Sequence, residues 1–179
     1  HKDFGLPREQ YPDSIALDFF TRLTSINAVK LLALSFRPME RDDKHGIVAV
    51  PPLLRPEVLG LAPYDGGYVH GYMLNSGFSV DVLNWHSTHP DTELRFFWDN
   101  WEAGPVKKID ETLSFYLIND KEFLHQMEGC HAYASTAGFE SVCEAMFLGK
   151  PILMVPSHIE QEINAFDAMR AGAGISCDR

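Results

Sequence analysis

The residues best suited to chemistry lie in residues 134–165, where small and polar side chains follow an apolar stretch. Thr136, Ala137, Gly138 and Phe139 lead into a predicted helix. Small residues there let backbone N–H groups close on a diphosphate, and the helix dipole favours its charge. The simpler alternative is a tight strand-to-helix turn that needs glycine for its geometry. Taken alone, the turn favours this simpler alternative.

Glu144 lies on the same predicted helix, one turn after Glu140. The i and i+4 spacing places both carboxylates on one face. A carboxylate there can accept two hydrogen bonds from a ribose diol. A solvated helix face is the usual place for a glutamate. Two like charges one turn apart are slightly unfavourable, which favours a ligand role for one of them.

A second strand exit follows at Pro156, after the predicted strand 152–155. Glu160 and Gln161 open the next predicted helix and could clamp sugar hydroxyls. Acidic residues in a first helical turn are also ordinary partners of the helix dipole. His158 lies at the same exit and is a further ligand candidate.

Other motifs indicate less. Gly77 lies in a polar loop, residues 75–78, which could contact phosphates or simply turn the chain. His86 and His89 have the spacing of metal ligands, but no third ligand is patterned nearby, so we interpret them as a surface loop without metal. The sequence has no G-x-S-x-G elbow, no P-loop and no G-x-G-x-x-G fingerprint.

The elements that must position these residues alternate along the chain. Predicted strands cover residues 68–74, 94–98, 113–118, 131–135 and 152–155, with a sixth from 175. One predicted helix starts at residue 79. Three more cover residues 120–127, 139–148 and 160–170, and we expect Asp120 to cap the first of these three. This alternation predicts an α/β fold, a Rossmann-like parallel sheet with helices on both faces. Parallel sheets of this kind bind ligands where their strands end.

Residues 1–55 form a separate segment. Residues 12–35 are predicted to be largely helical, residues 28–36 and 47–50 carry short apolar runs typical of strands, and a proline-rich connector follows. We place a domain boundary near Arg55.

Composition narrows the class. The chain has 179 residues, 45% hydrophobic residues and a formal charge of −10. The charge disfavours a nucleic-acid partner, and no apolar run approaches the ~18 residues of an integral membrane segment. The three cysteines have no C-x-x-C spacing, and we expect free thiols buried in or beside the core of a protein from a reducing compartment.

Together these pieces resemble the donor-binding C-terminal domain of GT-B glycosyltransferases, especially UDP-glycosyltransferases and MurG-type GlcNAc transferases. The matching positions are Gly138, Ser141, Glu144, Gly149, Pro151, Pro156, Gln161, Asn164 and Ala165. The resemblance is strong over residues 113–174 and weaker over 68–100. It implies that residues 1–55 are a remnant of the N-terminal domain with its linker, and that 56–179 form a donor-binding domain truncated at its C-terminus.

The resemblance also implies roles for single residues. Thr136, Ala137, Gly138 and Phe139 would line the diphosphate, and Glu144 would bind the ribose. Glu160 and Gln161 would hold the transferred sugar. Leu117 and Ile118 would face the base, and Gly77 would approach a phosphate.

Three positions depart from the plant-type signature. Thr136 stands where histidine is common, Glu140 where asparagine is common, and Leu117 where a base-stacking tryptophan is common. These departures indicate a bacterial-type branch.

The expected function is transfer of a sugar from a nucleotide diphosphate sugar, a UDP sugar, to an unknown acceptor in the cytoplasm or at the inner face of a membrane. The resemblance implies no metal or other cofactor, a catalytic base outside this chain, and a fragment that is inactive alone. The alternatives are a nucleotide-sugar epimerase or hydrolase of the same fold, and a non-catalytic donor-binding subunit that needs a partner chain.

Overall fold

The computed structural model of the protein describes residues 6–72 and 76–177. A seven-stranded sheet has the order β5-β6-β4-β3-β7-β8-β9. All its neighbouring strands are parallel except β5, which runs antiparallel to β6 at one edge. The strands are β3 (Val69–Tyr72), β4 (Leu94–Trp98), β5 (Val106–Lys108), β6 (Leu113–Leu117), β7 (Ala132–Ser135), β8 (Ile152–Met154) and β9 (Gly174–Ser176).

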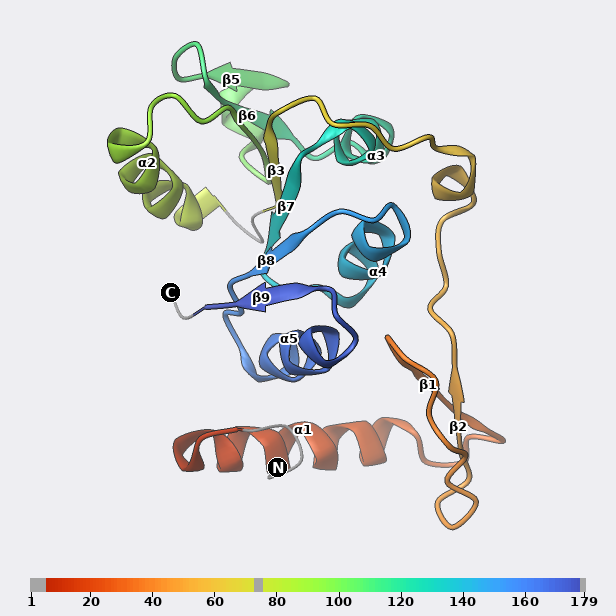
Figure 1. The fold of residues 1–179 in the computed structure, drawn as a ribbon. Coiled ribbons are helices and arrows are strands. Elements are labelled where there is room, and N and C mark those ends of the chain that lie inside the picture. Colours follow the sequence, from red (N-terminus) through yellow and green to blue (C-terminus); the bar gives the residue numbers. More distant parts are fainter. Residues whose placement is uncertain (1–5, 73–75, 178–179) are drawn as a thin grey trace.

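Helices lie on both faces of this sheet, as predicted (Figure 1). On one side is α2 (Ser79–Thr88); on the other are α3 (Asp120–Gly129), α4 (Phe139–Phe147) and α5 (Ile159–Arg170). Right-handed crossovers explain this division. The connection through α2 runs from β3 toward the β5 edge of the sheet, whereas the connections through α3, α4 and α5 run toward β9, so their helices lie on the opposite face. The Rossmann-like fold class is therefore confirmed.

Strand alternation divides the core into two layers. Phe97 of β4 and Tyr133 of β7 are fully buried beneath α3 and α4. Leu94 and Trp98 of β4 point to the opposite face and pack with Phe115 of β6. Successive residues of a strand face opposite sides, so β4 contributes to both layers.

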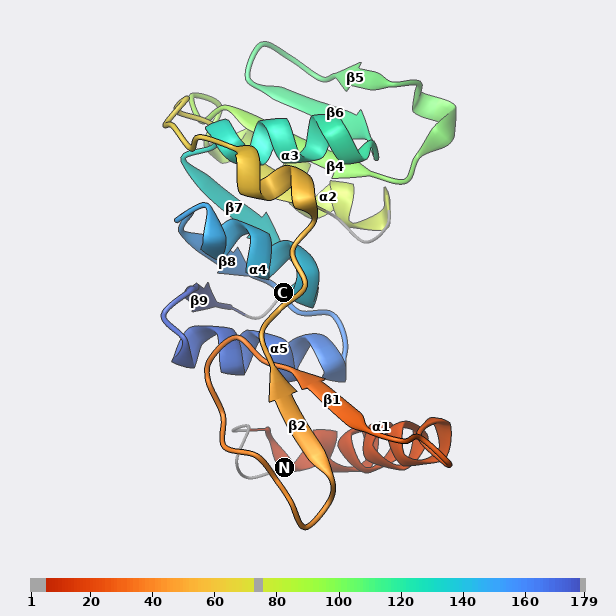
Figure 2. The same ribbon diagram turned by 90° about the vertical axis from the view of Figure 1, so that its right-hand side faces the viewer.

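The N-terminal segment forms a unit outside the main sheet. It contains α1 (Tyr11–Thr24) and a parallel pair, β1 (Leu31–Leu34) and β2 (Ile47–Val50). The helix ends at Thr24, earlier than predicted, because the strand-forming run begins within the predicted helix. Figure 2 shows α1 alongside α5 and the chain rising from β2 toward α3. Within the described residues, every helix is too short or too polar to span a membrane.

Several local expectations were wrong. The cap of α3 is Asn119, whose side chain accepts a hydrogen bond from the Glu122 N–H at 3.0 Å, and not Asp120. His86 belongs to α2 and not to a surface loop: it is buried, with Nε2 2.9 Å from Asp110 Oδ2. Cys177 is exposed, although Cys130 and Cys143 are buried as expected.

Candidate functional site

The β7–α4 turn carries backbone N–H groups that have no hydrogen-bond partner among the described residues. Gly138 is the N-cap of α4 and makes no side-chain capping bond. Within the described part of the chain, no acceptor meets the N–H groups of residues 138–141. Orphan N–H groups at a helix start favour an anion.

The conformation of this turn does not explain why residue 138 is glycine. Ala137, and not Gly138, takes the left-handed conformation, with φ 65°. Gly138 has φ −63° and ψ 128°, which any residue adopts. A Cβ at position 138 would meet only Ser141 Oγ, at the ordinary contact distance of 3.7 Å. Neither the backbone nor the packing of the protein requires glycine here, so the simpler alternative loses its support at this position.

The first turns of α5 hold the β7–α4 turn in shape. Gln161 is 5% exposed. Its Nε2 donates to Thr136 Oγ1 at 3.2 Å, and its Oε1 accepts from the Ser157 N–H and Oγ at 2.9 and 2.8 Å. Asn164 Nδ2 donates to the Ala137 carbonyl at 3.2 Å. Gln161, which was expected to hold the transferred sugar, is therefore also part of the hydrogen-bond network beneath the turn.

Glu144 is buried and paired, which excludes the alternative of a solvated helix face. It is 2% exposed, and its two oxygens accept hydrogen bonds from Arg55 Nε and Nη2, both at 2.6 Å. These bonds raise the pKa of Arg55 above its usual value. Arg55 also lies over the Phe123 ring and 3.6 Å from Asp120. A ribose diol would reach this carboxylate only if Arg55 shared or released it.

The remaining predicted residues follow the carboxyl edge of the sheet. Glu160 and His158 are exposed at the start of α5, and Gly77 is exposed in the turn η4 (Ser76–Phe78). Leu117 ends β6, and Ile118 follows it with 38% exposure. The structure thus brings the β7–α4 turn together with α5, while Leu117 and Ile118 lie further along the edge.

Phe139 makes a contact that the sequence did not indicate. Its ring packs on Phe36 of the N-terminal segment, with 4.4 Å between centroids. Arg37 adds an ion pair to Asp167 of α5 at 3.0 Å. The N-terminal segment is therefore anchored beside the predicted diphosphate residues.

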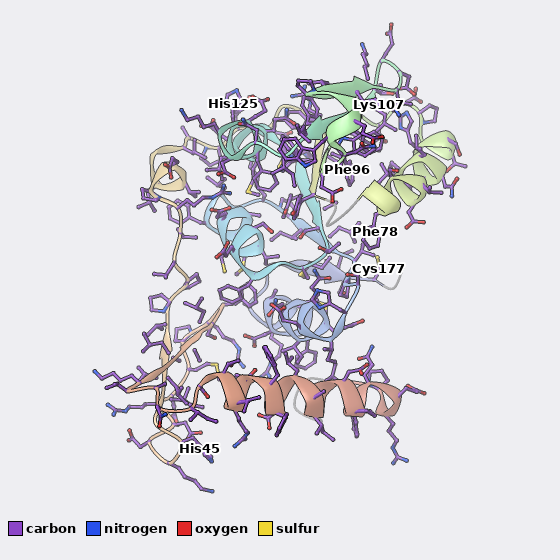
Figure 3. All side chains as sticks on the ribbon, turned by 180° about the vertical axis from the view of Figure 1, so that it is seen from behind. His45, Phe78, Phe96, Lys107, His125 and Cys177 are labelled. Atoms are coloured by element: carbon purple, nitrogen blue, oxygen red, sulfur yellow. The ribbon has the colours of Figure 1, made fainter. Side chains whose placement is uncertain are left out.

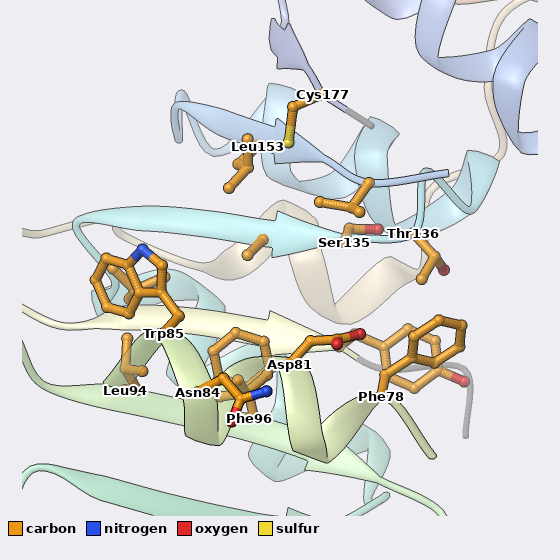
Figure 4. Close-up of a pocket in the computed structure, with 15 residues that line it drawn as sticks. Phe78, Asp81, Asn84, Trp85, Leu94, Phe96, Ser135, Thr136, Leu153 and Cys177 are labelled. Carbon is orange, nitrogen blue, oxygen red and sulfur yellow. The ribbon is translucent and has the colours of Figure 1, made fainter. Parts of the chain in front are cut away.

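A cavity of about 570 Å³ opens on the α2 side of the sheet. Phe78, Phe96 and Cys177 lie on this side (Figure 3). Trp85 of α2 faces Leu153 and Cys177 across the cavity (Figure 4). Of the predicted site residues only Thr136 lines it. Its walls are mainly apolar, so the diphosphate of a nucleotide fits the α4 N-terminus better than this cavity.

Comparison with known proteins decides the family. Residues 12–179 match the sequence profile of glycosyl transferase family 1. This chain belongs to glycosyl transferase family 1. The chain is also similar to mogroside IIIx synthase of Siraitia grosvenorii, at 43% identity over 47 residues, which are 26% of this chain and 10% of that protein.

Solved glycosyltransferases share the fold of this family member. SnogD from Streptomyces nogalater has a TM-score of 0.51 at 17% identity, over 80% of this chain and 40% of its own. Arabidopsis thaliana UGT89C1 complexed with UDP has a TM-score of 0.52 at 15% identity, over 76% of this chain and 39% of its own. The chain thus spans about two fifths of the length of these glycosyltransferases.

The sequence marked Arg55 only as the position of a domain boundary. Its partner Glu144 lies 89 positions away. The sequence carries no local pattern for such a contact.

Within the described residues, no group of three or more His, Cys, Asp or Glu side chains could hold a metal ion.

Proposed function

We propose that this chain binds a UDP sugar and supplies the donor-binding part of a GT-B glycosyltransferase. The observation that carries the proposal is Gly138: its missing side chain leaves room at the start of a helix whose first N–H groups are unpaired, and neither the backbone nor the packing of the protein requires that room. A diphosphate would use both the room and the N–H groups. Family membership and the similarity to a UDP-complexed glycosyltransferase support the same ligand.

In this proposal residues 136–139 surround the diphosphate. The N–H groups and the dipole of α4 stabilise the negative charge that develops on the departing nucleotide, without a metal ion. The exposed Glu160 is then the better candidate for the sugar hydroxyls, with Gln161 supporting the turn from beneath. The acceptor and the catalytic base would come from outside the residues named here.

Gly138→Ala tests the proposal directly. The position accepts alanine sterically. Alanine reduces the conformational entropy of the unfolded chain, which stabilises the fold, but it is a weaker N-cap than glycine. Because these two effects oppose each other, we expect stability to change by less than about 0.5 kcal/mol. The added methyl should occupy the ligand's space and weaken UDP binding about tenfold or more, measured by calorimetric titration. Gly60→Ala is the matched control, because its Cβ would meet nothing within 4 Å.

UDP, GDP and dTDP should be compared in the same titrations. Preference for another base would revise only the choice of UDP. Failure of all three to bind the wild-type protein would refute the proposal. Release of free sugar or of an epimer without an acceptor would instead indicate a hydrolase or an epimerase.

A further inference from the structure

An arginine of the linker covers a carboxylate at the same edge of the sheet as the β7–α4 turn. Asp120 begins α3 beyond the carboxyl end of β6, and its Oδ1 lies 3.6 Å from Arg55 Nη1. The other two nitrogens of the guanidinium, Nε and Nη2, donate to the two oxygens of Glu144. Arg55 therefore bridges the start of α3 and the body of α4, close to the anion site proposed at the α4 N-terminus.

Arg55 closes Glu144 to any ligand. The Glu144 side chain is 3% exposed, and both of its oxygens already accept a hydrogen bond. A ribose diol would have to bring two donor hydroxyls to this carboxylate from the solvent side. The Arg55 side chain is 35% exposed, so it is the part of the pair that an incoming ligand meets first. Ribose therefore reaches Glu144 only by displacing the guanidinium.

The position of Glu144 along α4 suits the ribose of a nucleotide whose phosphates bind at the helix start. Glu144 lies six positions after the N-cap Gly138, roughly 9 Å along the helix at about 1.5 Å per residue. Helical side chains lean toward the N-terminus, so the carboxylate lies nearer to the turn than its own Cα does. The ribose of a nucleotide is joined directly to the α-phosphate and lies within this reach.

A second carboxylate is already within reach of Arg55. The Asp120 side chain is 89% exposed, and its distance of 3.6 Å from Nη1 is longer than a hydrogen bond. Glu140, exposed in the first turn of α4, adds a third negative charge that favours the guanidinium. A rotation of the arginine side chain would move it from Glu144 to Asp120 without leaving the cation unpaired.

The backbone of Arg55 is held in place, so only the side chain has to move. The Arg55 carbonyl accepts a hydrogen bond from the Val58 N–H at 3.0 Å, within the turn η3 (Pro56–Gly60). Val58 is fully buried in the same core cluster as Phe123. The proline that follows Arg55 further restricts its backbone.

We propose that Arg55 is an autoinhibitory latch on Glu144. The ribose of the donor displaces this latch, and Arg55 then pairs with Asp120. The proposal rests on the proposed function, because it requires a nucleoside diphosphate at the start of α4. The latch reduces the apparent affinity for the nucleotide according to the fraction of molecules in which Glu144 is closed. The ligand class is a nucleoside diphosphate with free 2′ and 3′ hydroxyls.

Calorimetric titrations with UDP and 2′,3′-dideoxy-UDP test the latch. The readout is the ratio of the UDP affinity to the dideoxy-UDP affinity, because it cancels any effect of a changed charge on the phosphates. Arg55→Lys keeps a cation beside Glu144 but loses the two-point contact, so the ratio should rise about threefold or more above that of the wild type. Asp120→Asn removes the second partner of Arg55 and should lower the ratio about threefold.

The matched control is Glu57→Gln, which removes an exposed carboxylate from the same linker. Its ratio should equal that of the wild type. Inorganic pyrophosphate, which has no hydroxyl for Glu144, should bind the wild type and Arg55→Lys with affinities that differ no more than those for dideoxy-UDP.

The outcomes are separable from those of the proposed function. A lower ratio in Arg55→Lys would show that Arg55 supports the ribose contact instead of blocking it, and an unchanged ratio would show that it has no part in that contact. Either result overturns the latch and leaves UDP binding intact. Equal affinities of the wild type for UDP and dideoxy-UDP would overturn displacement by ribose. A wild-type protein that binds neither nucleotide nor pyrophosphate overturns both proposals.

Discussion

A single arginine in the linker occupies the carboxylate that the sequence assigned to ribose. Arg55 meets Glu144 in a two-point geometry with both distances at 2.6 Å, and the Glu144 side chain is only 3% exposed. Paired burial explains how a glutamate can lie inside the protein, since a buried carboxylate without a partner would be strongly unfavourable. The linker is therefore joined to α4 by charge as well as by the chain.

Breaking this pair should cost stability. Glu144→Ala should lower the free energy of unfolding by about 2–3 kcal/mol, below the range for fully buried pairs because Arg55 can still reach water. The double variant Arg55→Met with Glu144→Leu should return to within about 1 kcal/mol of the wild type. Urea unfolding of the wild type, Arg55→Met, Glu144→Leu and the double variant measures the coupling, and simply additive losses would contradict it. UDP binding by the double variant at wild-type affinity would remove Glu144 from the ribose contact.

At the scale of elements, α5 acts as the support for the diphosphate turn. Ala137 is held at φ 65°, an uncommon conformation for a residue with a Cβ. Asn164 binds the carbonyl of Ala137, and Gln161 binds the neighbouring Thr136. These bonds from one helix stabilise a conformation that the turn alone would not favour.

Glu160 and Gln161 should therefore differ in their effects. Gln161→Ala should lower the free energy of unfolding by about 1–2 kcal/mol, because buried partners lose their hydrogen bonds, and should weaken UDP and the UDP sugar equally. Glu160→Ala should leave stability within about 0.5 kcal/mol and weaken only the UDP sugar. Paired titrations with the nucleotide and its sugar conjugate compare the two variants. A sugar-specific loss in Gln161→Ala would assign Gln161 to the sugar instead.

The sequence predicted the elements with strong apolar patterns and missed those without one. The strands predicted at residues 94–98 and 47–50 have the same bounds as β4 and β2, because short apolar runs are typical of strands. β5 was missed because residues 106–108 are all exposed and carry two lysines. The burial of Glu144 could not be predicted, since the helical period identifies a face but not the distant residue that covers it. Gly138, Gln161 and Glu160 remain predictions of function that need ligands to test.

At the scale of the whole molecule, the core between the sheet and α3 contains an ionisable ring. His70 of β3 is fully buried among Phe97, Phe123 and Tyr133. Burial lowers the pKa of His70 from 6.5 to about 3. The folded protein therefore keeps this ring neutral down to about pH 3, whereas the unfolded chain begins to protonate it near pH 6.5.

Acid should destabilise the fold through this residue. Between pH 6.5 and about 3 the unfolded chain binds a proton at His70 and the folded protein does not. Stability from this group is thus complete above pH 6.5 and falls with pH by up to about 1.4 kcal/mol per unit. His70→Leu should flatten the dependence across that window, measured by urea unfolding at several pH values. His125→Gln, at an exposed position, should keep the wild-type slope; equal slopes in both variants would exclude His70 as the cause.

The position of Cys177 makes the cavity on the α2 side open to chemical labelling. Burial raises the pKa of Cys130 to about 11 and that of Cys143 to about 12, so both remain unreactive thiols near neutral pH. Cys177 is exposed and lines the cavity opposite Trp85. A maleimide dye would therefore attach at one position without any mutation. Its emission would report from the apolar face while a nucleotide occupies the carboxyl edge, so the two regions of the sheet can be followed in the same sample.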